Sequence, residues 1–148
     1  MRVEKISRTE LQYEDYLKIH FDENSNICGR VSGIDELILI CWSSELIEPL
    51  LVKHGSNLLI GVDNKIAVYN LIQKVMIALV PLSSRFLSFI VRKRSVVIIS
   101  ELEIFVLNTR EYTIVNHVNL PDLVEDYQEN EGGIRIICMD ETALVVEC

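Results

Sequence analysis

The stretch that decides the fold is Leu58–Asn70, which reads LLIGVDNKIAVYN. Apolar residues stand on both sides of Asp63-Asn64-Lys65, a polar triplet of the kind that reverses the chain between two strands. β-Branched and other apolar residues dominate both arms, and such runs favour extended backbone. The stretch therefore predicts a β-hairpin whose tip is the polar triplet.

A second hairpin with the same layout is predicted at Val96–Asn108 (VVIISELEIFVLN), with a polar tip at Ser100–Glu103. It aligns with the first hairpin without gaps at an offset of 38 residues. The matched pairs include Ile60 with Ile98, Ile66 with Ile104, Val68 with Val106, and Asn70 with Asn108. The same offset leads to Ile134, where IRIICMDETALVV adds two more strands if one extra residue is allowed. The pattern indicates an internal repeat.

The rest of the chain is predicted to be mostly β as well. Its 148 residues, 49% of them hydrophobic, fit a single β-rich domain over residues 1–148. The exception is Pro121–Asn130, where a proline suited to a first helical turn precedes carboxylates at helical spacing, and Gly132-Gly133 follows. We therefore expect an all-β fold, mainly an antiparallel meander, with one short helix near 121–130. Further strands are expected at Tyr16–Phe21, Glu36–Trp42, Lys74–Val80, Phe86–Val91 and Tyr112–Leu120.

Short strands joined by tight turns at a period near 38 resemble the blades of a β-propeller over roughly residues 58–148. The glycine-histidine and tryptophan-aspartate pairs of the commonest blade family are absent, so the resemblance identifies no specific family. A closed propeller takes at least about four blades, whereas three repeats and an N-terminal segment fill this chain. The resemblance implies either an incomplete propeller that pairs with itself or blade-like hairpins within a twisted sheet or sandwich. The number of repeats favours the sheet or sandwich.

Charged residues are grouped along the chain instead of interspersed. Residues 1–52 carry a net charge of −5, residues 53–110 carry +5 and residues 111–148 carry −8, for a total of −8. Such an acidic end repels phosphate and attracts a cationic surface. We interpret the basic run Arg92-Lys93-Arg94 as a solvated turn, and we expect no nucleic-acid partner.

The acidic end also supplies the predicted partner-binding residues. Carboxylates can take the positions that phosphates occupy on a basic nucleic-acid enzyme, and tyrosine is a common interface anchor. We predict a non-enzymatic protein-binding module, most concretely a bacterial immunity or antitoxin-type inhibitor of a basic toxin such as a nuclease. A blade-like scaffold or accessory subunit that homo-oligomerises and a small-molecule-binding β domain stay open as alternatives. The candidate contact residues are Asp122, Glu125, Asp126, Tyr127, Glu129 and Glu131.

No motif for chemistry stands out. The histidines His20, His54 and His117 show no metal-ligand spacing, and no phosphate-binding or nucleophile loop occurs. We expect neither enzymatic activity, nor a cofactor, nor a metal. The N-terminus lacks a secretory signal, and the apolar runs are far shorter than the roughly 20 residues that span a bilayer. The four cysteines form no CxxC pair and are predicted to be reduced, so we expect a cytoplasmic protein without a membrane partner.

Overall fold

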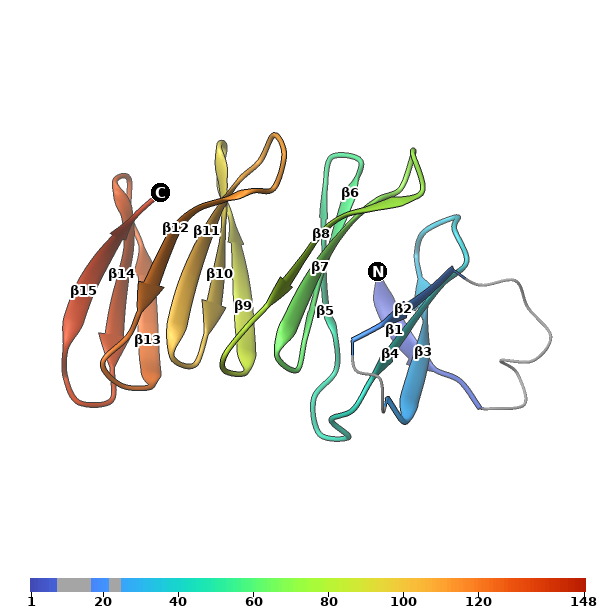
Figure 1. Ribbon diagram of the computed structural model, residues 1–148, viewed down its shortest axis with the longest axis horizontal. Helices are drawn as coiled ribbons and strands as arrows, with labels where there is room; N and C mark the ends of the chain where they lie inside the picture. Colours follow the sequence, from blue (N-terminus) through green and yellow to red (C-terminus); the bar gives the residue numbers. More distant parts are fainter. Residues whose placement is uncertain (8–16, 22–24) are drawn as a thin grey trace.

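The computed structural model describes residues 1–7, 17–21 and 25–148, and over these residues it consists of strands and their connections. The strands form four sheets that follow one another along the chain and stand side by side in a row (Figure 1). Each sheet is called a blade below and is numbered from the N-terminus.

Blade 1 differs from the others in its connections. Its strand order is β1-β3-β4-β2, and β2 runs parallel to β4 while the other pairs are antiparallel. Blades 2 and 3 are four-stranded antiparallel meanders, and blade 4 has three strands. The bounds in blade 1 are β1 Arg2–Lys5, β2 Leu17–His20, β3 Ile27–Ser32 and β4 Ile38–Trp42. Those in blade 2 are β5 Leu50–His54, β6 Asn57–Val62, β7 Lys65–Asn70 and β8 Val75–Pro81. Those in blades 3 and 4 are β9 Phe86–Val91, β10 Ser95–Ser100, β11 Glu103–Asn108, β12 Ile114–Asn119, β13 Val124–Glu129, β14 Gly133–Cys138 and β15 Ala143–Glu147.

The predicted hairpins are confirmed as β6–β7 and β10–β11. The 38-residue period also recurs in hydrogen bonds that lie outside the pairing between strands. Asn70 and Asn108 each accept with the side-chain oxygen from the backbone N–H groups two and three residues ahead. Lys74 and Tyr112, also 38 residues apart, both adopt a left-handed backbone with φ of 57°. Two backbone hydrogen bonds also repeat from the junction of blades 2 and 3 to the junction of blades 3 and 4. At the first junction, Leu82 N–H donates to Asn64 O and Phe86 N–H donates to Asp63 O. At the second, Leu120 N–H donates to Leu102 O and Val124 N–H donates to Glu101 O. The repeat is therefore a structural unit.

Apolar side chains fill each space between neighbouring blades. Trp42 and Ile60 lie in the core between blades 1 and 2, Phe89 and Ile98 in the core between blades 2 and 3, and Ile136 in the core between blades 3 and 4. Burying such a side chain contributes about 1.5–3 kcal/mol, so these three cores hold the row together. The structure has the stack of blades, so the preference for a twisted sheet or sandwich, which the number of repeats suggested, is wrong.

The helix predicted near 121–130 is wrong, because Val124–Glu129 forms strand β13 and pairs with β14. A β-bulge between Val124 and Asp126 inserts an extra residue into the strand. Val124 and Tyr127, three residues apart, therefore both pack against the core between blades 3 and 4. A bulged strand thus produced the apolar spacing that resembled a helix.

The prediction that all four cysteines are reduced is also wrong. Cys28 on β3 and Cys41 on β4 lie directly opposite each other, with their Cα atoms 4.2 Å apart, and form a disulfide. The two cysteines become neighbours through the register of β3 against β4. Their spacing along the chain does not indicate this contact. Cys138 and Cys148 are the free cysteines among the described residues. The cytoplasmic location stays a prediction.

Candidate interaction surfaces

The predicted acidic contact residues lie on or beside β13. Glu125, Asp126 and Glu131 are exposed, whereas Asp122 is half-buried and its carboxylate accepts the backbone N–H of Leu123. Glu129 is exposed as well, so the structure brings four of the five predicted carboxylates to the surface of the terminal blade. Their binding to a partner stays a prediction.

Two other members of that set have partners within the protein. Tyr127 is half-buried and packs against the core between blades 3 and 4. The Glu129 carboxylate lies 3.7 Å from the guanidinium of Arg92. Because Tyr127 packs inward, less of its ring surface is exposed to a partner than in a typical aromatic interface anchor.

Arg92 links blade 3 to blade 4. Its side chain is 15% exposed. Nη1 donates to the carbonyl oxygens of Asn130 and Gly133 at 2.9 and 3.1 Å, and Nη2 donates to that of Glu131 at 2.8 Å. The sequence offered no sign of this role, because the carbonyls belong to a turn 38 or more residues further along. The interpretation of Arg92 as part of a solvated turn therefore holds poorly for its side chain.

The most apolar exposed element is β8, the edge strand of blade 2. Val75–Pro81 reads VMIALVP and has no charged residue. Met76 is 41% exposed and Leu79 is 53% exposed, and Val75 and Ile77 are also exposed. By contrast, the edge strand β12 of blade 3 reads IVNHVN. A free edge leaves backbone N–H and C=O groups unpaired, so an apolar edge favours the addition of another strand.

The last strand of blade 4 is an edge strand as well. Within residues 1–7, 17–21 and 25–148, β15 is last in its sheet order and pairs with β14 alone. Val145 at its centre is 60% exposed. Sequence reasoning predicted both β8 and β15 as strands but missed that they are edges, because sheet order is not a local property.

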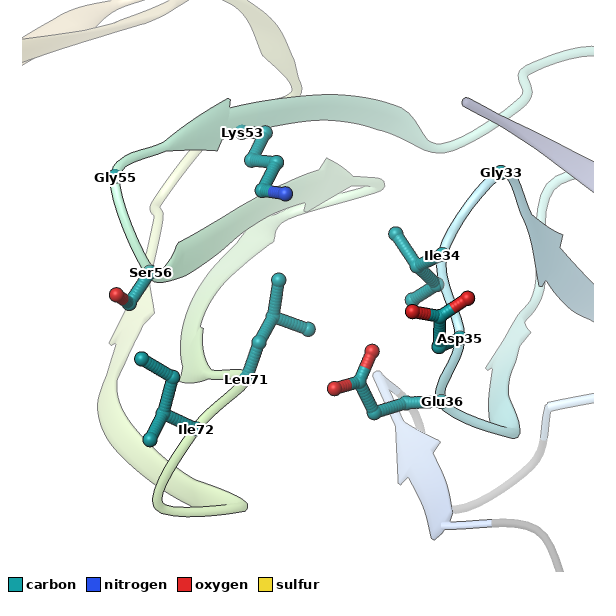
Figure 2. A pocket seen from close by; sticks show the side chains of 9 residues that line it. All are labelled: Gly33, Ile34, Asp35, Glu36, Lys53, Gly55, Ser56, Leu71 and Ile72. Atoms are coloured by element: carbon teal, nitrogen blue, oxygen red, sulfur yellow. The ribbon is translucent and has the colours of Figure 1, made fainter.

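A pocket of about 310 Å³ lies between blades 1 and 2. Figure 2 shows Lys53 and Leu71 on one wall and Ile34, Asp35 and Glu36 on the opposite wall. Within the described part of the chain, no ion pair joins Lys53 to either carboxylate. Such opposed charges suit a small molecule that carries both signs, which is the feature that the small-molecule alternative would use.

A buried carboxylate, that of Glu103, lies at the junction between blades 2 and 3. Glu103 is 3% exposed and accepts the backbone N–H of Ser83. Nε2 of His117 lies 2.9 Å from Glu103 Oε2, and the His117 ring stacks on Phe105 at 4.0 Å between centroids. Burial raises the pKa of Glu103, but the Ser83 N–H and hydroxyl and His117 outweigh burial and hold the pKa below its ordinary value of 4.5. The contact between Glu103 and His117 therefore stabilises the fold. Cys138 takes no part in this contact, because it lies in the core between blades 3 and 4.

Among the described residues, no group of three or more histidine, cysteine, aspartate or glutamate side chains is placed to hold a metal ion. In the same part of the chain, no helix has the length and hydropathy to cross a bilayer.

Comparison with known proteins places the fold. No protein-family model and no curated protein matches the chain. The computationally designed Ika4 protein matches with a TM-score of 0.56 and 14% identity, over 88% of this chain and 89% of that one. BamB from Moraxella catarrhalis matches with a TM-score of 0.52 and 10% identity, over 80% of this chain and 36% of that one. The WD40 domain of Neurospora crassa Pan2 gives 0.45 and 10%, over 82% and 41%.

The chain therefore spans well under half the length of the two natural proteins that it resembles. The likeness concerns the fold alone, because the identities are low. Together with the repeated four-stranded sheets, the likeness to BamB shows that this chain is built of β-propeller-type blades and that the blade resemblance of residues 58–148 is confirmed.

Proposed function

We propose that this protein is a non-enzymatic, blade-type interaction scaffold that associates with further copies of itself. The observation that carries the proposal is the apolar edge strand β8, which stays exposed although the cores between the blades are closed. Because a fold does not determine a function, the proposal rests on this surface. Edge strands that must stay single are commonly protected by charged side chains, and β8 has none.

Self-association is tested by multi-angle light scattering across a range of protein concentrations. We expect the wild-type mass to rise with concentration, and we expect Leu79→Lys to weaken association at least about tenfold, or about 1.4 kcal/mol. A lysine at this position places a charge where an added strand would cover it. Leu46→Lys is the control, because Leu46 is 97% exposed and lies outside the strands. A wild-type protein that stays monomeric at every concentration would overturn the proposal.

A second candidate function is the binding of a cationic protein through the acidic surface of blade 4. The exposed carboxylates Glu125, Asp126 and Glu131 support it, since no lysine or arginine pairs with them within 4.0 Å among the described residues. The finer proposal is that this partner is a basic toxin such as a nuclease, which the protein would inhibit.

Conversion of these three carboxylates to amides tests the second candidate. With lysozyme as a generic cationic probe, we expect the variant to bind more weakly and with a smaller salt dependence, because exposed charges act through a screened Coulomb field. Glu45→Gln with Glu48→Gln is a matched control in the exposed connection before β5. Equal binding by the variant and the wild type would show that the acidic surface of blade 4 does not bind the cationic protein.

A further inference from the structure

We infer that the pocket between blades 1 and 2 binds a small zwitterion, in which an aliphatic body joins an ammonium group to a carboxylate. A free amino acid such as leucine and a short peptide such as leucyl-leucine both have this chemistry. The inference goes beyond the proposed self-association and does not depend on it, because none of the residues that line the pocket belongs to β8.

Three connections that are far apart in the sequence build the pocket. The connection from β3 to β4 supplies Ile34, Asp35 and Glu36. The end of β5 supplies Lys53, and the turn after β7 supplies Leu71. Each of the two facing walls therefore carries an aliphatic side chain and a charged group, and the charges of the two walls are opposite (Figure 2). Such walls offer an ionic partner to each end of a zwitterion and an apolar contact to its middle.

The charged groups of the pocket are available to a ligand. Over residues 1–7, 17–21 and 25–148, no salt bridge involves Lys53, Asp35 or Glu36. Glu36 is half-buried, and a carboxylate that has lost part of its hydration is more stable beside an opposite charge. Burial raises the pKa of Tyr69 in the core between blades 1 and 2, and the negative charge of Glu36 raises it further. Solvent therefore screens the Glu36 charge only in part, which strengthens its attraction for an ammonium group.

The apolar part of the pocket continues the core between blades 1 and 2. Leu71 is a buried member of that core, and Ile34 is half-buried and packs against it. A ligand whose aliphatic body covers these two side chains removes apolar surface from water, which favours binding. The volume of about 310 Å³ lies at the lower end of the roughly 300–1,000 Å³ that ligand sites occupy. This size favours an amino acid or a dipeptide over a larger ligand.

Titration of the full chain with four probes, followed by the amide chemical shifts in nuclear magnetic resonance spectra, tests the inference. Leucine and leucyl-leucine carry both charges, leucinamide keeps only the ammonium group, and N-acetyl-leucine keeps only the carboxylate. We expect a zwitterion to shift the amide signals of Gly33–Glu36 and Gly55–Ser56. Each singly charged probe should bind about threefold to fivefold more weakly, which is the scale of a partly exposed ion pair. The tighter of the two zwitterions identifies the ligand as a free amino acid or as a peptide.

Two variants assign the roles of the charged groups. Lys53→Gln should weaken the binding of the zwitterion but not that of leucinamide, which has no carboxylate for Lys53 to contact. Asp35→Asn combined with Glu36→Gln should weaken the binding of the zwitterion and of leucinamide, but not that of N-acetyl-leucine. Circular dichroism compares the fold of each variant with the wild type, and Asp35→Asn alone replaces the double variant if that one unfolds.

Lys93→Gln and the pair Glu45→Gln with Glu48→Gln are the matched controls, because these exposed residues lie outside the pocket. They should bind the zwitterion as the wild type does. The inference is overturned if neither zwitterion shifts the named signals up to about 10 mM, or if Lys53→Gln binds as tightly as the wild type. Equal binding of a zwitterion and a singly charged probe also overturns it. Light scattering without ligand tests self-association separately, so none of these outcomes bears on the proposed function.

Discussion

Replacement of Gly133 by alanine is expected to lower the free energy of unfolding by about 2–3 kcal/mol, because overpacking forces the backbone to shift. Gly133 begins β14 opposite Glu147, and an added Cβ would collide with the backbone carbonyl oxygen of Val146 on β15. A backbone atom cannot rotate out of the way as a flexible side chain does. The two strands would have to separate at this end of blade 4, where the Gly133 carbonyl also accepts a hydrogen bond from Arg92.

The neighbouring glycine is a matched control for this prediction. A Cβ at Gly132 meets only the side-chain oxygen of Asn130, at 3.9 Å. Gly132→Ala should therefore leave the stability unchanged or raise it by about 0.4–1 kcal/mol, since alanine restricts the unfolded chain. Urea unfolding followed by circular dichroism measures both variants. Equal stability of the two variants would show that the approach of β15 to Gly133 is looser than described.

Replacement of Glu103 by alanine is the second large effect and should cost about 1–3 kcal/mol at neutral pH. The substitution removes the acceptor of the buried Ser83 N–H and the partner of His117. Glu103→Gln is the matched variant, because its side-chain oxygen keeps an acceptor for Ser83 and loses only the charge. Urea midpoints at pH 7 should fall in the order wild type, Glu103→Gln, Glu103→Ala.

The pKa of Glu103 gives this prediction a pH dependence with a definite sign. Its folded pKa lies below the ordinary value of 4.5, so the native state favours the charged carboxylate. The contribution of Glu103 is complete above pH 4.5 and is lost as the pH falls from there through the folded pKa. Stability measured between pH 7 and pH 3 should decline less steeply in Glu103→Gln than in the wild type. Parallel curves for the two proteins would contradict the assignment.

The hairpins and the 38-residue repeat could be predicted because they depend on local properties. Alternating apolar residues and a polar tip specify two paired strands without reference to the remaining chain. The helix prediction failed at Val124–Glu129 because a bulge, which pairing with β14 creates, changes the residue spacing. The cysteine prediction failed because the contact between Cys28 and Cys41 follows from the register of β3 against β4.

The interaction surfaces were only partly predictable. The acidic residues after Pro121 could be counted, and four of the five predicted carboxylates are exposed, yet the inward packing of Tyr127 follows from the strand bulge. The apolar run Val75–Pro81 resembles a fully buried strand, because runs of that kind commonly lie inside sheets. Its place at the edge of blade 2 is visible only in the sheet order.

The amino-acid sequence by itself determined that this protein is made of repeated hairpins and that its charges lie in blocks, since both features are written in neighbouring residues. The tertiary structure alone decided that the hairpins stack as blades, that Cys28 meets Cys41, and that β8 and β15 are edge strands. These features depend on which distant strands become neighbours. That choice is made by the burial of apolar faces between blades and by the closing of backbone hydrogen bonds, which no single segment can satisfy alone.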